Sequence, residues 1–204
     1  MNTMEPSQKN LLLPPIREVL LTGRDKPLVM MATPVTQDLY LHVMGENPAC
    51  FQGEGYPSNL QFPAENVSAL DAEAFCSRLS EMLGLTGAAV YRLPTETEWA
   101  WACTCGGSFQ YPEDPQELLL YAHCNAESPV PVGEHRPNIW GLWDTLGNIW
   151  EWTASDRGGH RVLRGGSWDD LPCFLRAADR DGYDPADRSN SIGFRCCRNL
   201  GGTP

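Results

Sequence analysis

The chain has 204 residues, which is enough to bury a substantial hydrophobic core in one sizeable domain. Its formal net charge of −11 argues against nucleic acid or an anionic membrane as the partner, because both require clustered cations. Seven tryptophans, 19 glycines and 17 prolines indicate a loop-rich fold that aromatic side chains anchor.

The first part of the chain predicts an arm, a hairpin and a short helix. Residues 1–18 are polar and interrupted by prolines, so we expect an N-terminal arm followed by a single domain over residues 19–204. Apolar residues on both sides of a turn at residues 22–25 predict a β-hairpin over residues 19–31. Thr36 is suited to cap a short helix that follows.

Capping boxes predict two longer helices. Ser68 precedes Asp71 by three residues, a spacing at which each side chain bonds the backbone amide of the other residue. The apolar stripe expected on this helix comprises Leu70, Ala74, Phe75, Leu79, Met82 and Leu83. Thr95 and Glu98 repeat the capping box on the next helix, and Glu96 also suits the positive end of its dipole. Capping therefore accounts for these glutamates without a catalytic role.

Residues 138–152, NIWGLWDTLGNIWEW, alternate tryptophans with small and polar residues. This alternation predicts turns and strands whose aromatic faces fill the core.

The segment 164–198 alternates stiff residues with short islands. The stiff residues, here called the frame, are 164–168, 172, 175–177, 180, 185, 188 and 192–195. The island residues are Asp169, Asp170, Leu171, Cys173, Phe174, Asp179, Asp181, Gly182, Tyr183, Asp184, Asp187, Ser189, Asn190 and Ser191. Because Trp, Phe, Ile, Pro and Arg lock a backbone while Asp, Gly and Ser bury little, the pattern predicts a scaffold that presents a surface. We expect the frame arginines to bind loop carbonyls and carboxylates, with an anionic-ligand pocket as the alternative.

Three blocks in this order resemble the formylglycine-generating enzyme, or sulfatase-modifying factor, family. They are YRLPTETEW at residues 91–99, the tryptophan-rich residues 138–152 and the frame. The resemblance extends from about residue 34 to residue 198. It implies an α+β domain with a C-type-lectin-like fold, which has two main helices, small antiparallel sheets and much irregular loop.

More narrowly, the placing of the island residues resembles the variable region of proteins that diversity-generating retroelements diversify. In those systems adenines of template codons are randomised, so a diversified position does not become Lys, Glu, Gln, Met or Trp. None of the island residues is one of these five. The resemblance implies a hypervariable surface over residues 164–198 that binds a protein or other macromolecular ligand. We expect Phe174 and Tyr183 to be its anchors and the aspartates to favour a basic or polar target.

The resemblance also implies a calcium site. Carried over residue by residue, its ligands are the side chains of Asp144 and Glu151 and the backbone carbonyls of Gly147 and Ile149. Calcium binds hard oxygen ligands of these kinds in a flexible cage. The alternative is that Asp144 caps a turn and Glu151 pairs with a frame arginine.

Oxidase activity in this family depends on two cysteines that bind copper through paired thiolates. The present chain has only Cys173 in that part of the sequence, so we expect neither copper nor catalysis. The alternative is a formylglycine-generating-type oxidase or other redox enzyme on the same fold, in which Cys173 works with Cys196 or another distant thiol. The four histidines (His42, His123, His135 and His160) show no ligand spacing and are expected to be surface or loop residues.

The sequence shows none of the patterns of a signal peptide or a membrane-spanning helix. A signal peptide has a basic segment and an apolar run, and a spanning helix has roughly 20 apolar residues. We therefore expect a cytoplasmic protein without membrane insertion, and export stays open if a signal has been removed. The eight cysteines are then expected to be mostly reduced core thiols.

Overall fold

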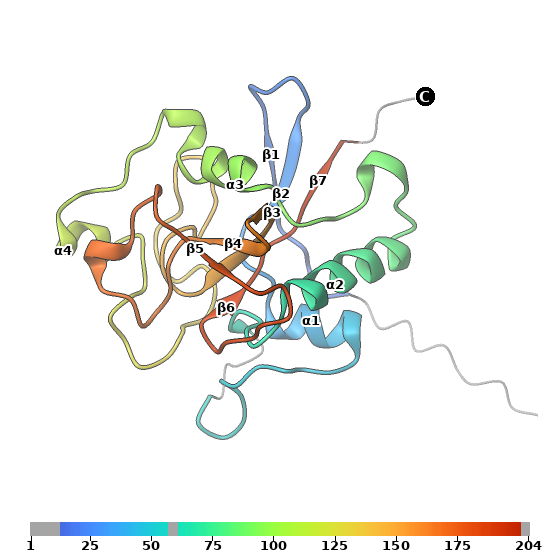
Figure 1. Ribbon diagram of the computed structural model, residues 1–204, viewed down its shortest axis with the longest axis horizontal. Helices are drawn as coiled ribbons and strands as arrows, with labels where there is room; N and C mark the ends of the chain where they lie inside the picture. Colours follow the sequence, from blue (N-terminus) through green and yellow to red (C-terminus); the bar gives the residue numbers. More distant parts are fainter. Residues whose placement is uncertain (1–12, 57–60, 201–204) are drawn as a thin grey trace, which may run out of the picture.

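The computed structural model describes residues 13–56 and 61–200, and within them the chain forms two small sheets and four α-helices (Figure 1). Most of the expected N-terminal arm, residues 1–12, lies outside the described residues. The next part of that arm lies against the domain, because Leu13 and Ile16 pack on the largest core cluster. None of the described helices is long and apolar enough to cross a membrane.

The first sheet joins the two ends of the domain. It consists of β1 (Glu18–Leu21), β2 (Leu28–Met31) and β7 (Cys197–Asn199), in the order β1-β2-β7. All its pairings are antiparallel, and the β1–β2 hairpin confirms the prediction for this segment. Since β7 follows the frame directly, this sheet fastens the C-terminal segment to the N-terminal hairpin.

The second sheet is built from strands between residues 150 and 193. It consists of β3 (Trp150–Arg157), β4 (His160–Arg164), β5 (Arg180–Tyr183) and β6 (Ile192–Gly193), in the order β5-β4-β3-β6. Here β6 runs parallel to β3, so the expectation of antiparallel sheets is wrong for this pair. Glycine is required at position 193 in β6, because a Cβ atom there would lie 2.2 Å from the backbone carbonyl oxygen of Ala64, in the loop before α2 (Ala69–Met82).

The α-helices begin where the capping residues predict. They are α1 (Gln37–Met44), α2 (Ala69–Met82), α3 (Glu96–Cys103) and the single turn α4 (Pro115–Leu118). Thr36 caps α1, and both predicted capping boxes are present at the starts of α2 and α3. Local side-chain bonds therefore set the helix starts.

The stripe predicted for α2 is correct only at Phe75 and Leu79. Leu70, Ala74, Met82 and Leu83 are exposed, whereas the buried residues are Ala69, Ala72, Phe75, Cys76, Leu79 and Ser80. The buried face is thus rotated toward small residues, which allow α2 to approach its neighbours closely. At one such contact the Sγ atoms of Cys76 and Cys196 lie 3.4 Å apart.

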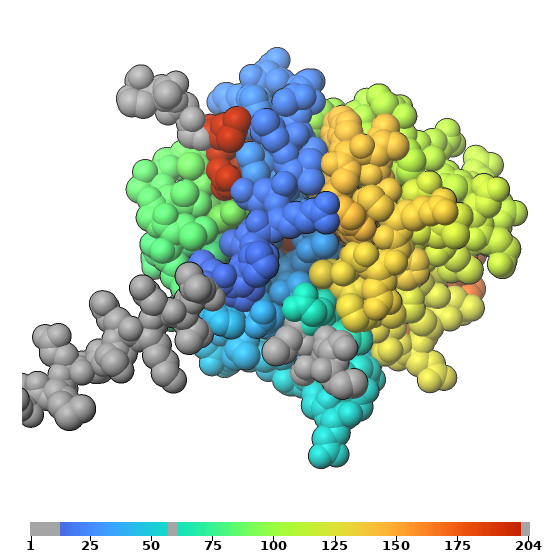
Figure 2. All heavy atoms as spheres, turned by 180° about the vertical axis from the view of Figure 1, so that it is seen from behind, coloured from blue at the N-terminus to red at the C-terminus, as the bar shows by residue number. Residues whose placement is uncertain are grey.

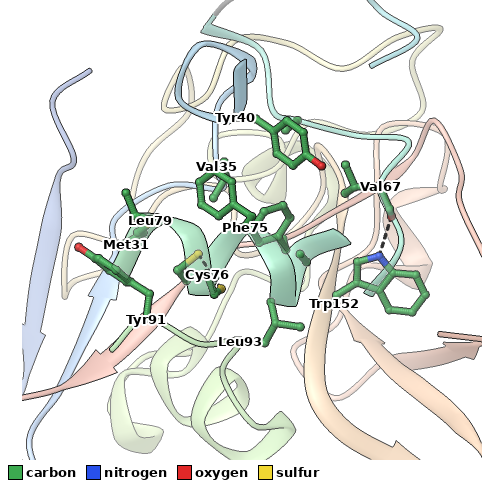
Figure 3. Packing of buried hydrophobic residues seen from close by; sticks show 14 of the residues in the cluster. Met31, Val35, Tyr40, Val67, Phe75, Cys76, Leu79, Tyr91, Leu93 and Trp152 are labelled. Carbon is green, nitrogen blue, oxygen red and sulfur yellow. Dashed lines mark hydrogen bonds between the residues drawn. The ribbon is translucent and has the colours of Figure 1, made fainter. Parts of the chain in front are cut away.

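The largest core cluster ties α1 and α2 to the second sheet (Figure 3). The rings of Phe75 and Phe194 meet edge to face with centroids 5.2 Å apart. Trp152 is fully buried, and its indole N–H donates to the Val67 carbonyl at 2.9 Å (Figure 3). Because Phe194 belongs to the frame, the frame is anchored in the main core.

Candidate ligand-binding surface

Every island residue is accessible to solvent. Ten are exposed, namely Asp169, Leu171, Cys173, Phe174, Asp181, Gly182, Tyr183, Asp184, Asp187 and Asn190. The other four (Asp170, Asp179, Ser189 and Ser191) are half-buried. Among the frame residues, Leu175, Ile192 and Phe194 are buried, whereas Arg176, Arg180 and Arg188 are exposed. The frame is therefore anchored inside by its large apolar residues, and the islands lie outside.

The islands lie on one side of the molecule. In Figure 1, the 3-10 turn η4 (Pro172–Phe174), strand β5 and the loop before β6 all lie on the near side. Figure 2 shows the molecule from behind, and there the deep orange to red colours of residues 165–195 are seen only at the margin. The two views agree that the islands share a face.

Large apolar side chains protrude from this face. The exposed fractions are 56% for Phe174, 49% for Leu171 and 40% for Tyr183. Tyr183 ends β5, an edge strand whose residues are all exposed. Such rings provide contact area to a partner at small entropic cost, so Phe174 and Tyr183 are placed as anchors would be.

Hydrogen bonds to backbone atoms hold the islands. The Asp170 carbonyl accepts from the Asn125 amide at 2.8 Å, and the Ser191 carbonyl accepts from the Trp150 amide at 2.8 Å. The Ser189 carbonyl likewise accepts from an amide in the loop before α2, at 2.9 Å. These bonds fix the course of the loops independently of a regular sheet.

Three island aspartates also bond to the frame through their carboxylates, and two of them, Asp170 and Asp179, are half-buried; the third, Asp169, accepts from the Ser167 hydroxyl. Asp170 accepts from the backbone amide and the hydroxyl of Ser167, both at 2.9 Å. Asp179 accepts from the Arg176 guanidinium at 2.8 Å. These two half-buried side chains therefore have a structural task in addition to the binding role predicted for them.

The frame arginines have structural partners, which agrees with the interpretation preferred from the sequence. Arg164 is buried, and its guanidinium donates to the carbonyls of Ala177 at 2.5 Å and Ala178 at 3.1 Å. Arg195 is also buried, and its guanidinium donates to Glu151 and to four backbone carbonyls, those of Met31, Ala32, Trp143 and Asp144. Each arginine thus holds loops that have no regular secondary structure.

The remaining frame arginines form ion pairs near the surface. Arg176 pairs with Asp179 at 2.8 Å, Arg180 with Glu96 at 2.8 Å and Arg188 with Asp71 at 2.7 Å. Two of these acids, Asp71 and Glu96, stand in the first turns of α2 and α3. The frame is therefore linked to α2 and α3 by charge pairs.

The two side chains implied as calcium ligands already have protein partners. Both Glu151 oxygens accept from Arg195 at 2.7 Å, and Oε2 also accepts from the Trp99 indole at 2.8 Å. Asp144 Oδ2 accepts from the Gly133 amide at 2.8 Å, and burial raises the pKa of Asp144 to about 6. Because a guanidinium already neutralises Glu151, these contacts favour the alternative in which Glu151 pairs with a frame arginine.

Calcium binding stays a prediction, and thermal unfolding tests it. Because Arg195 already neutralises Glu151, we expect added CaCl2 to leave the melting temperature unchanged. The measurement compares calcium, magnesium and EGTA at constant ionic strength. A rise in melting temperature with calcium that EGTA reverses would contradict this expectation.

The structure keeps Cys173 apart from Cys196. Cys173 is exposed in η4 and lines a cavity of about 390 Å³ with Tyr111 and Leu118. Cys196 is fully buried against Cys76, and burial raises the pKa of its thiol. A thiol pair of the kind that the enzyme alternative requires is therefore not assembled from these two residues.

Glu65 is a buried acid that the sequence did not single out. Its Oε1 accepts from the Phe51 amide at 2.9 Å, while Oε2 is buried without a hydrogen-bond partner. Burial raises the pKa of Glu65 to about 7. Phe51 in turn meets the ring of Trp168 in the frame edge to face. A glutamate two residues after Pro63 in a loop carries no sequence signal for such burial.

The chain is similar to known proteins over most of its length. The model of the family described as sulfatase-modifying factor enzyme 1-like domain matches residues 21–200. The protein "Inactive C-alpha-formylglycine-generating enzyme 2" of Bos taurus is 34% identical over 176 residues, which cover 74% of this chain and 55% of the relative. The chain thus spans about half the length of that relative.

Solved structures share the fold. Treponema denticola variable protein 1 superposes with a TM-score of 0.76 and 25% identity, covering 92% of this chain and 93% of its own. The Major Tropism Determinant U1 variant has a TM-score of 0.53 and 13% identity, covering 90% of this chain and 55% of its own. The α+β, C-type-lectin-like fold is confirmed. With the family match over residues 21–200, the chain belongs to the sulfatase-modifying factor enzyme 1-like domain family.

Proposed function

We propose that the chain is a ligand-binding protein that displays a hypervariable surface on a C-type-lectin-like scaffold, as variable proteins of diversity-generating retroelements do. One observation carries the proposal. All 14 island residues are accessible to solvent, whereas the frame residues Leu175, Ile192 and Phe194 are buried. Substitutions at such surface positions do not remove contacts in the core.

Two comparisons support a binding role over catalysis. A solved structure that resembles this chain over nine-tenths of both lengths, with 25% identity, is named a variable protein. A relative with 34% identity is named an inactive formylglycine-generating enzyme. Cys173 is exposed whereas Cys196 lies in the core, which favours the same interpretation.

The chemistry of the islands favours a basic or polar protein as the ligand. Four exposed island residues are aspartates (Asp169, Asp181, Asp184 and Asp187), and the whole chain carries a net charge of −11. Aspartates around exposed rings steer a cationic partner and set its orientation, while the rings provide most of the contact.

The first test replaces the ten exposed island residues together by serine. Because none contributes a buried contact, we expect the free energy of unfolding to change by less than about 2 kcal/mol. The matched control is Phe194→Ala in the frame, which should cost about 3–5 kcal/mol because it leaves a cavity in the core. Urea unfolding followed by circular dichroism measures both. A ten-residue variant that fails to fold would contradict the proposal.

The second test examines diversification itself. We expect the DNA near codons 169–191 to be accompanied by a near-identical repeat that differs at adenines, and by a reverse-transcriptase gene. Sequencing of independent isolates should then find substitutions at island codons and none at frame codons. Equal substitution in both sets would overturn the retroelement assignment, and it would leave the fold unaffected.

A further inference from the structure

Two of the four histidines, which show no pairing in the sequence, meet in the structure. His123 lies in the loop after α4, and His135 lies 12 residues later in the loop that leads to the tryptophan-rich segment. Their ring centroids are 5.7 Å apart, and the ring planes are inclined by 44°. The pair belongs neither to the islands nor to the frame, so the proposed display function does not account for it.

The hydrogen bonds of these two rings leave nitrogen lone pairs available. His123 has one ring nitrogen, Nε2, 2.9 Å from the Ser128 carbonyl oxygen. Because a carbonyl only accepts, Nε2 carries the proton and Nδ1 of the same ring carries the lone pair. His135 Nδ1 is buried and has no hydrogen-bond partner among the residues that the structure describes. A backbone carbonyl that orients an imidazole in this way is the usual companion of a metal-binding histidine.

The backbones that carry both rings are fixed. The His123 carbonyl accepts from the Asn148 amide at 2.8 Å, and His123 also forms a bridge with Gly147. On the other side, the Arg136 amide donates to the Leu120 carbonyl at 2.8 Å. The two imidazoles are therefore held in position by bonds that do not depend on a ligand, as a preorganised site requires.

We propose that His123 and His135 together bind one divalent transition-metal ion, such as zinc or nickel, each through one ring nitrogen. A metal–nitrogen bond of about 2.0–2.1 Å places the centroids of two rings on a shared ion roughly 5–6 Å apart, which the observed separation matches. Imidazole suits zinc and nickel. Among the described residues no group of three or more His, Cys, Asp and Glu side chains gathers in metal-binding geometry. In this proposal, water supplies the remaining ligands of the ion.

Calorimetric titration with Ni²⁺ and Zn²⁺ tests the site in the full chain without a histidine tag. A parallel titration uses the Cys50→Ser/Cys173→Ser variant, since these two thiols are exposed and could bind metal on their own. We expect one equivalent of metal to bind in both proteins. His123→Ala and His135→Ala should each weaken binding at least about tenfold, while His42→Ala and His160→Ala serve as matched controls and leave it unchanged.

The titration results either support or overturn the metal site. Absence of binding, or binding that neither His123→Ala nor His135→Ala weakens, overturns the proposal. Melting temperatures of all variants are recorded first, and His123→Asn and His135→Gln replace any alanine variant that does not fold. A Co²⁺-loaded protein whose visible spectrum changes only when His123 or His135 is replaced would give independent support. Neither His123 nor His135 lies in the islands, so a failure of the metal-site proposal leaves the proposed display function unaffected.

Discussion

Replacing Arg195 by methionine is expected to lower the free energy of unfolding by about 3–5 kcal/mol, because the Glu151 carboxylate is then left buried without an opposing charge. Both side chains are essentially inaccessible to solvent. The guanidinium also donates to four backbone carbonyls that would lose their donors. Urea unfolding monitored by tryptophan fluorescence measures the loss.

Two variants control this result. Arg188→Met removes a frame arginine that is 46% exposed in its pair with Asp71, and it should cost less than about 1 kcal/mol. The double variant Arg195→Met/Glu151→Gln removes both buried charges, and it should recover part of the loss. A single Arg195→Met change that costs no more than the Arg188 control would show that the buried pair does not hold the frame.

The stability of the protein is expected to fall as the pH rises from 4.5 through 7, because of Glu65. Burial raises the pKa of this carboxyl from 4.5 to about 7. Between these values the folded protein keeps a proton that the unfolded chain releases, so folding is favoured at the acid end. At 1.36 kcal/mol per pKa unit, the free energy of unfolding should decrease by roughly 3 kcal/mol across this window.

Glu65→Gln isolates this effect, because glutamine imitates the protonated carboxyl and does not ionise. We expect the variant to match the parent protein near pH 5 and to exceed its free energy of unfolding by roughly 3 kcal/mol above pH 7. Glu81→Gln, an exposed change on α2, serves as the control. Urea unfolding at pH 5, 6, 7 and 8 provides the data. Parallel pH profiles for Glu65→Gln and the parent would refute the assignment.

Much of the fold is predictable because its signals are local. The capping boxes at Ser68 and Thr95 depend on residues three positions apart, so the sequence contains the whole interaction. Residue types likewise predict the separation of the islands from the apolar frame residues. An Asp-rich island buries little in any context, whereas Phe194 and Ile192 must be covered.

The features that the sequence does not reveal depend on contacts between distant segments. The buried face of α2 turns toward Ala72 and Cys76 because the partner segment near Cys196 comes close. The burial of Glu65 and the meeting of His123 with His135 depend on how separate loops pack. No periodicity or spacing encodes these approaches, and only the assembled chain shows them.

The bonds that fix the islands are made largely to peptide groups. Arg164 binds the carbonyls of Ala177 and Ala178, and the amides of Asn125 and Trp150 bind the carbonyls of Asp170 and Ser191. Every amino acid supplies the same carbonyl, whatever its side chain. Where the anchoring uses only carbonyls, it does not depend on amino-acid identity, and a new binding specificity there requires no compensating mutation elsewhere in the gene.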